Sequence, residues 1–109
     1  MILISKYLIP RGYIGMTVFP FMFLKSKALK GNDVLINHEK IHLKQQLELL
    51  IILFFVLYTL EFLFRLLQYK KWHLAYRNIS FEREAYLNEK DLNYLKKRPF
   101  LGFIKYFKK

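Results

Sequence analysis

The stretch "LINHEKIHLKQQ", residues 35–46, decides how the rest of the chain is interpreted. It contains His38, Glu39 and His42 in the order H-E-x-x-H. Residues four apart lie on the same face of an α-helix, so both imidazoles can reach one metal ion. Glu39 lies about 100° around the helix from His38, close enough to that face to hold a water molecule. The stretch therefore predicts a helix carrying two Zn²⁺ ligands, His38 and His42, and a general base, Glu39.

The helical pattern around this motif extends far toward the C-terminus. Asn32 or Asp33 is suited to cap the helix at its start. From Val34 as far as Tyr69 the chain contains neither glycine nor proline. We therefore expect one long helix of roughly 36 residues, about 54 Å in length.

The second half of this helix, about residues 47–68, is the most apolar part of the chain. Glu61 and Arg65 interrupt it four residues apart, a spacing that allows them to pair on one face. The uninterrupted apolar part is shorter than the roughly 20 residues that span a bilayer. A membrane span and a buried or interfacial helix therefore both remain open.

Strand-like sequence precedes the motif helix. Residues 3–25 include "YIGMTVFPFMFLK", which is rich in β-branched and aromatic residues, after a turn at "IPRG". This pattern predicts a β-hairpin in which Pro20 marks an edge or a bulge. With the helices that follow, the sequence predicts an α+β fold.

A second helix is expected after a basic, aromatic break at "QYKKWHLAYRN", residues 68–78. Residues 80–97 have a 4-3-4-3 spacing that forms one mostly apolar stripe. The residues of the stripe are Phe81, Ala85, Asn88, Leu92 and Leu95.

A catalytic zinc ion needs a third protein ligand. Glu82 and Glu84 are the main candidates, and they lie about 200° apart on a helix, so both cannot face one ion. Glu84 is nearer the apolar stripe and Glu82 is farther from it, which leaves the choice open. Less favoured candidates are His73 in the basic break, Glu89 and Asp91.

Composition limits the class of protein. The 109 residues suit one domain, residues 1–109, and the absence of cysteine excludes disulfides and thiolate metal sites. The net charge of +11 favours an anionic partner. Because 54 % of the residues are hydrophobic, we expect an anionic membrane surface and not nucleic acid. The basic, aromatic tail, about residues 95–109, fits such a surface. The first residues lack the features of a signal peptide, so we expect the inner membrane or its cytoplasmic face.

The motif followed by a downstream E-x-x-A resembles the gluzincin clan of zinc metallopeptidases. The resemblance implies that Glu82 is the third ligand, and that Tyr86 stands where the clan has an aspartate that orients a histidine. The order of "GMTVFPFMFLK", "LINHEKIHLKQQ" and "AYRNISFEREAY" is also similar to small, uncharacterised bacterial proteins of the HExxHxxQ type. This likeness implies a zincin-like minidomain, with an N-terminal hairpin, a motif helix and a second helix that brings in the third ligand.

The expected function is a membrane-associated zinc hydrolase, in the first place a metallopeptidase acting on a peptide or protein. Residues 17–23 would pair with an extended peptide. Arg77 or Arg83 would steady an oxyanion, and Gln45 or Gln46 would line the site, although helix surface is their more ordinary place. The alternative is a non-catalytic protein that zinc staples together and that binds a membrane or a partner. A second copy of the chain is another way to cover the apolar helix.

Overall fold

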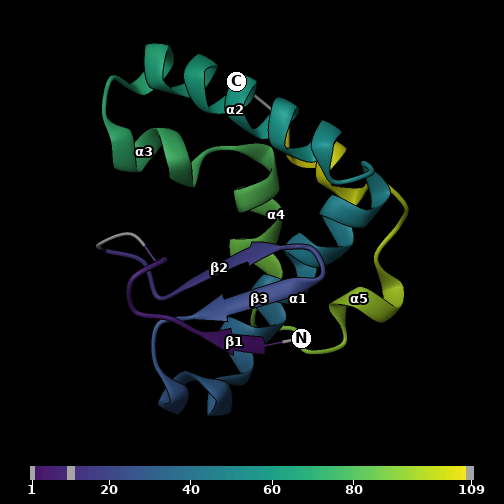
Figure 1. The fold of residues 1–109 in the computed structure, drawn as a ribbon. Helices are drawn as coiled ribbons and strands as arrows, with labels where there is room; N and C mark the ends of the chain where they lie inside the picture. Colours follow the sequence, from purple (N-terminus) through teal and green to yellow (C-terminus); the bar gives the residue numbers. More distant parts are fainter. Residues whose placement is uncertain (1, 10–11, 108–109) are drawn as a thin grey trace.

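The computed structural model describes residues 2–9 and 12–107, so parts of the predicted "IPRG" turn and C-terminal tail lie outside the described residues. In the described part, a small three-stranded sheet and five α-helices confirm the α+β class (Figure 1). The strands are β1 (Ile2–Ile4), β2 (Gly15–Val18) and β3 (Phe21–Leu24). The α-helices are α1 (Asp33–Glu48), α2 (Ile52–Tyr69), α3 (Trp72–Arg77), α4 (Ser80–Asn88) and α5 (Tyr94–Lys97), and the 3₁₀ helices are η1 (Lys27–Gly31) and η2 (Gly102–Tyr106).

The predicted hairpin is present as β2 and β3, which pair antiparallel from Gly15 opposite Leu24 to Val18 opposite Phe21. Pro20 lies in the two-residue turn between them, and not at an edge or a bulge as predicted. Proline has no backbone N–H, and in the turn no N–H is needed at this position for the hydrogen bonds between the two strands. β1 pairs parallel with β3, which makes β3 the central strand.

The predicted single helix over residues 34–69 is wrong, because the chain turns between α1 and α2. The end of α1 has the hydrogen bonds of a Schellman motif: the Ile51 N–H donates to the Gln46 carbonyl, and the Leu50 N–H donates to the Leu47 carbonyl. Leu50 has φ +56°, a left-handed conformation that glycine usually supplies at this position. No glycine or proline in this part of the sequence therefore indicated the break between α1 and α2.

The turn places the start of α2 over α4. Phe54 lies with its ring centroid 4.7 Å from that of Phe81, and the two belong to a buried cluster with Leu49 and Ile79. If α1 and α2 formed one straight helix, Phe54 would lie away from α4 and this cluster would not form. Burying one such side chain contributes about 1.5–3 kcal/mol, so several together outweigh the roughly 1–3 kcal/mol cost of a left-handed leucine.

The second predicted helix, residues 80–97, is also interrupted. α4 ends at Asn88, where the side-chain amide nitrogen of Asn37 lies 2.8–3.2 Å from the carbonyls of Asn88, Glu89 and Asp91, and its two hydrogens are shared among these acceptors. Leu92, which was expected on the apolar stripe, is 55 % exposed in the turn that follows. Leu95, the last residue of the stripe, lies in α5 and packs partly buried against Ile41, Ala85 and Tyr94, so the stripe is interrupted at Leu92.

Two other expectations need correction. The basic, aromatic break over residues 68–78 contains a helix, α3, which packs along α2. The C-terminal tail is also partly packed into the protein: Phe103 of η2 lies with its ring 4.4 Å from Phe81. Arg98, one of the basic tail residues, is buried between Glu48 and Glu84.

α1 lies between the sheet and α4 (Figure 1). Its N-terminus is capped as expected, because the Asn32 side chain accepts a hydrogen bond from the Leu35 N–H. A second buried cluster, Ile41 with Ala85 and Tyr94, joins α1 to α4 and α5. The buried face of α1 therefore meets α4 on one side and β2 on the other.

Replacing Leu50 by glycine tests the end of α1. Leu50→Gly is expected to leave the free energy of unfolding unchanged, or to raise it by up to about 1 kcal/mol, because glycine adopts this conformation without strain. The leucine side chain is 82 % exposed, so little packing is lost. Denaturant unfolding followed by circular dichroism measures the change.

The matched control is Leu53→Gly, inside α2, which is expected to lower the same free energy by about 1 kcal/mol or more. An equal loss in both variants would contradict the left-handed end of α1.

Candidate metal centre

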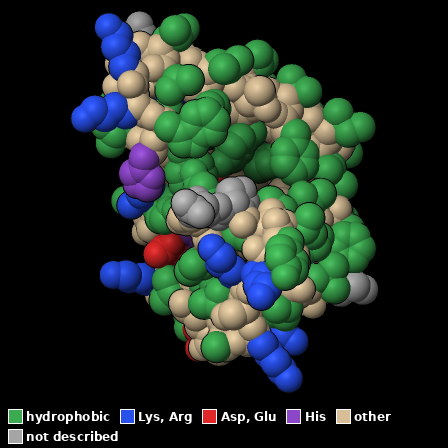
Figure 2. Space-filling model, turned by 60° about the vertical axis from the view of Figure 1, so that its left-hand side comes forward, with side chains coloured by type: hydrophobic (Ala, Val, Ile, Leu, Met, Phe, Trp, Pro, Cys, Tyr) green, Lys and Arg blue, Asp and Glu red, His purple; other side chains and the backbone are tan. Residues whose placement is uncertain are grey.

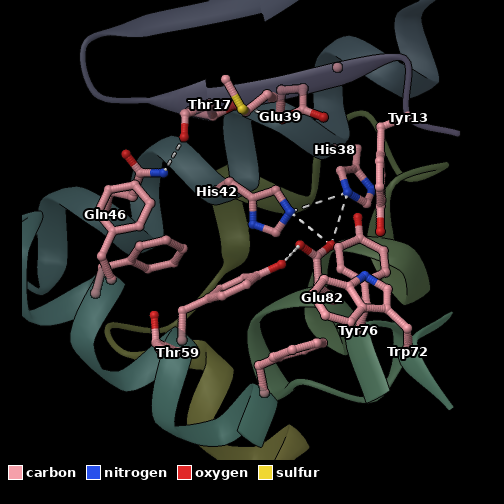
Figure 3. Close-up of a pocket in the computed structure, with 16 residues that line it drawn as sticks. Tyr13, Thr17, His38, Glu39, His42, Gln46, Thr59, Trp72, Tyr76 and Glu82 are labelled. Carbon is pink, nitrogen blue, oxygen red and sulfur yellow. Dashed lines mark hydrogen bonds and ion pairs between the residues drawn. The ribbon is translucent and has the colours of Figure 1, made fainter. Parts of the chain in front are cut away.

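Three predicted side chains from two helices meet at one point. His38 and His42 project from the same face of α1, and Glu82 projects from the first turn of α4 (Figure 3). The His42 Nε2 atom lies 3.2 Å from His38 Nε2 and 3.1 Å from Glu82 Oε1. The third separation, from His38 Nε2 to Glu82 Oε1, is 3.5 Å. All three residues are buried, and together they form a group with the composition and spacing of a metal site.

These separations suit a four-coordinate zinc ion. Nitrogen and oxygen ligands lie about 2.0–2.2 Å from zinc, so two corners of the tetrahedron are about 3.3–3.6 Å apart. The three measured separations, 3.1–3.5 Å, are close to this edge length. His38, His42 and Glu82 would therefore occupy three corners and leave the fourth open, as catalytic zinc sites do.

The second ring nitrogen of each histidine has an acceptor beside it. His38 Nδ1 lies 2.7 Å from Glu89 Oε1, and His42 Nδ1 lies 2.8 Å from Gln45 Oε1. An ionised carboxylate and an amide oxygen can only accept, so both Nδ1 atoms carry hydrogen. When a metal ion takes the place of the proton that the cluster holds, each Nε2 atom would present its lone pair to the ion, which is the tautomer a metal requires.

The orientation of Gln45 is itself determined by its contacts. Its amide nitrogen donates to the Phe81 carbonyl at 3.0 Å and to Glu84 Oε1 at 2.8 Å. Both amide hydrogens are thus used, and the oxygen is the atom that faces His42. The expectation that Gln45 and Gln46 lie on the helix surface is wrong, because both are fully buried.

α2 positions the third ligand. The Tyr58 hydroxyl donates to Glu82 Oε2 at 2.6 Å, which leaves Oε1 directed at the histidines. Two residues before Glu82, the backbone N–H and the hydroxyl of Ser80 both donate to the Glu61 carboxylate, each at 2.6 Å. The start of α4 is therefore tied to α2 by Glu61.

The electrostatics of the cluster favour a positive charge. Burial by itself would lower the pKa of His42, but Glu82 and, more weakly, Glu39 outweigh it and raise that pKa to about 9. Burial would likewise raise the pKa of Glu82, but His42 and His38 hold it well below its ordinary value. At neutral pH the three side chains therefore hold a proton between them. A metal ion would supply positive charge at the same place.

Glu39 is held against the sheet beside this cluster. The Thr17 hydroxyl of β2 donates to Glu39 Oε1 at 2.6 Å. A Cβ atom at Gly15 would lie 3.0 Å from Glu39 Oε2, so glycine leaves the room that this carboxylate occupies. The neighbouring turn is tied down by Gln46, which accepts from the Phe19 N–H and donates to the Thr17 carbonyl. β2 therefore fixes the predicted general base.

A cavity of about 600 Å³ adjoins the site, and His38, Glu39, His42 and Glu82 all line it. β2, α2 and α3 provide the opposite walls (Figure 3). Figure 2 shows hydrophobic side chains around a hollow on this face of the molecule. The aromatic lining consists of Tyr13, Phe54, Phe55, Tyr58, Phe62, Trp72 and Tyr76. The cavity therefore suits an apolar group of a substrate.

Three of the other acidic and histidine candidates lie away from this cluster. Glu84, the alternative third ligand, is buried but accepts from Tyr94 and pairs with Arg98. His73 is exposed on α3, and Asp91 pairs with Lys97 near the surface. The structure thus brings together the ligand set that the sequence resemblance implied.

The proposed oxyanion residues and the clan's orienting position also have other contacts. Arg77 stacks 3.6 Å above the ring of Tyr86, and Arg83 donates to the Tyr106 carbonyl. Tyr86 packs edge-on against His38, and Glu89 accepts the Nδ1 hydrogen instead. The sequence offered Glu89 only as a ligand, and did not indicate this role.

No family model, curated protein or solved structure matches the chain.

Removing the Glu89 carboxylate tests whether it orients His38. Glu89→Ala is expected to weaken zinc affinity about 10–100-fold, because partners of a ligating histidine usually contribute that much. Competition with a chromogenic chelator measures the affinity. His73→Ala, an exposed histidine outside the site, should leave it unchanged. Wild-type affinity in Glu89→Ala would rule out the role assigned to Glu89.

Proposed function

We propose that this protein is a zinc-dependent hydrolase, and specifically a metallopeptidase. His38, His42 and Glu82 would hold the ion, and Glu39 would be the general base. The observation that carries the proposal is that these four buried side chains line one cavity. A ligand set with an open corner and a carboxylate beside it has the parts that amide hydrolysis requires.

Each residue of the site has a place in this chemistry. Zinc, when bound, polarises a substrate carbonyl and lowers the pKa of water. Glu39 would take a proton from the attacking water and give it to the amine nitrogen as the carbon–nitrogen bond breaks. The Thr17 hydrogen bond would keep Glu39 oriented, and the Tyr58 hydrogen bond would do the same for Glu82.

The outer edge of β2, which does not face β3, favours a peptide as substrate. The Lys25 N–H donates to the Ile14 carbonyl, and hydrogen-bonded pairs alternate along antiparallel strands, so the backbone groups of Gly15 and Thr17 face away from β3. Both residues line the cavity. Gln46 already donates to the Thr17 carbonyl, so an extended peptide would add along the remaining backbone groups of Gly15 and Thr17. The surface expected over residues 17–23 is thereby moved to β2, because β3 is paired on both sides and has no open edge.

The order of the elements supports a zincin-like minidomain. An edge strand lies beside the motif helix, and a later helix supplies the third ligand. This is the arrangement that the resemblance to gluzincins implies. The departure at Tyr86 is offset in this proposal by Glu89, which supplies a carboxylate to the same histidine.

A second function, from a different class, uses the same ligands. Because His38 and His42 lie on α1 and Glu82 lies on α4, zinc at this point would tie the two helices together in a protein that only binds a membrane or a partner. Glu39 and the aromatic cavity have no part in such a staple. The two functions therefore differ in what the loss of Glu39 would do.

Exchanging Glu39 for glutamine separates them. Glu39→Gln is expected to lower the rate of peptide hydrolysis at least 100-fold while the zinc content stays near that of the wild type, because an amide cannot accept the proton. Fluorogenic peptides with large apolar side chains beside the scissile bond provide the assay. Chelation should abolish hydrolysis, and added zinc should restore it.

Lys40→Gln is the control, since it also introduces glutamine, at the next, exposed residue of α1. Its rate should equal that of the wild type. If zinc-loaded wild type cleaves no peptide, or if Glu39→Gln cleaves as fast, the peptidase proposal fails and the staple is favoured.

A further inference from the structure

α2 carries a large apolar face that the rest of the described chain does not cover. Only 17 % of this 18-residue helix is buried, although among the described residues it is the one helix long and apolar enough to cross a bilayer. Monomeric soluble proteins seldom expose continuous apolar patches of more than a few hundred Å². We call the exposed residues the α2 face: Ile52, Leu53, Val56, Leu60, Leu63 and Leu67.

The charges of α2 are turned away from this face. Glu61 and Arg65 pair as expected, at 3.4 Å, and both are buried toward α4 and the C-terminal segment. Glu61 accepts from Ser80, and the Arg65 guanidinium lies 5.3 Å from the ring of Phe107. The helix therefore turns its acidic and basic side chains toward the protein interior, and its exposed side chains are mostly apolar, with Thr59 and Gln68 as the exposed polar ones.

Basic residues border the α2 face. Lys70 and Lys71 follow α2 directly and are exposed. Figure 2 shows hydrophobic side chains over the upper part of the molecule, where α2 and α3 lie, with Lys and Arg side chains at its edge. Such a border, with a net charge of +11, attracts anionic lipid and repels a second copy of the chain.

The packing of α2 also indicates how this helix would be oriented at a membrane. Contacts to the rest of the chain run along its inner side: Phe54 meets Phe81 near the start, Phe62 meets Trp72 of α3 farther on, and Phe64 meets Phe107. If α2 crossed a bilayer, these partners and the buried polar site beside them would be carried into the hydrocarbon. Lying along the surface needs only the outer side to enter the membrane.

We propose that the α2 face rests in the interfacial layer of an anionic membrane, with the helix axis along the membrane surface. Aliphatic side chains bury roughly 5–10 Å deep in such a contact, and flanking lysines remain among the headgroups. This contact does not depend on the proposed hydrolase activity, and the test below needs no turnover.

Trp72 supplies the probe. It is the only tryptophan of the chain, it is 65 % exposed, and it packs against Phe62 of α2. The full-length protein is mixed with vesicles of phosphatidylcholine alone, or with added phosphatidylglycerol. We expect flotation with the anionic vesicles, weaker binding at high salt, and no quenching of Trp72 by deep brominated lipids, because the Trp72 ring lies against the inner side of α2.

Variants then locate the contact. Leu60→Ser, Leu63→Ser and Leu67→Ser combined should weaken binding to anionic vesicles more than tenfold. Leu87→Ser with Leu92→Ser, two exposed leucines outside the α2 face, should leave it unchanged. Circular dichroism and thermal unfolding confirm that each variant is folded.

Several results would overturn the proposal. Equal binding to neutral and anionic vesicles would exclude the anionic surface, and quenching by deep brominated lipids would indicate a span. No vesicle binding, together with a dimer that the leucine variant dissociates, would assign the face to a second copy. Binding lost equally in the control variant would show that the α2 face is not the site.

Discussion

The buried polar contact between α1 and α4 is the constraint on which the rest of the structure depends. A helix that packs into a small domain normally buries an apolar stripe, but six of the seven buried residues of α1 are polar, with Ile41 the exception. Burying such groups costs several kcal/mol each unless hydrogen bonds replace water. Asn37, His38, His42 and Gln45 all find partners on or just after α4, so their contacts fix how the two helices align. That alignment is what brings Glu82 to the histidines.

α2 connects this polar contact to the proposed functions. Its inner side gives Glu61 to the start of α4, Tyr58 to the third ligand and aromatic rings to the cavity. Its outer side is the apolar α2 face. The left-handed turn at Leu50 makes both possible, because it sends α2 back over α4 and away from the line of α1. In the proposed account, one helix thus supports a hydrolytic site on one side and a membrane surface on the other.

The grouping of His38, His42 and Glu82 could be predicted from the sequence, whereas the residues that support this group could not. The four-residue spacing of His38 and His42 is a property of any helix, and Glu82 came from the resemblance to gluzincins. The wheel alone left Glu84 open, because it lies nearer the apolar stripe. Glu84 is indeed buried there, paired with Arg98 from a distant part of the chain. The left-handed conformation of Leu50 and the contact of Glu89 with His38 could not be predicted for a related reason. Leu50 adopts a conformation that glycine usually adopts, and Glu89 lies in a turn that is hydrogen-bonded to Asn37. Such tertiary contacts leave no periodic pattern.

The central claim is that His38, His42 and Glu82 hold zinc, and its most direct test is zinc K-edge X-ray absorption combined with metal content. The protein would be purified without added metal, as wild type and as Glu82→Ala, with Asp91→Ala as an acidic control outside the site. We predict about one zinc per wild-type chain, four-coordinate with two imidazoles and oxygen ligands, retained in Asp91→Ala and lost or weakly held in Glu82→Ala. Wild-type protein that contains no zinc and takes up none on titration, or zinc binding that Glu82→Ala leaves unchanged, would contradict the account.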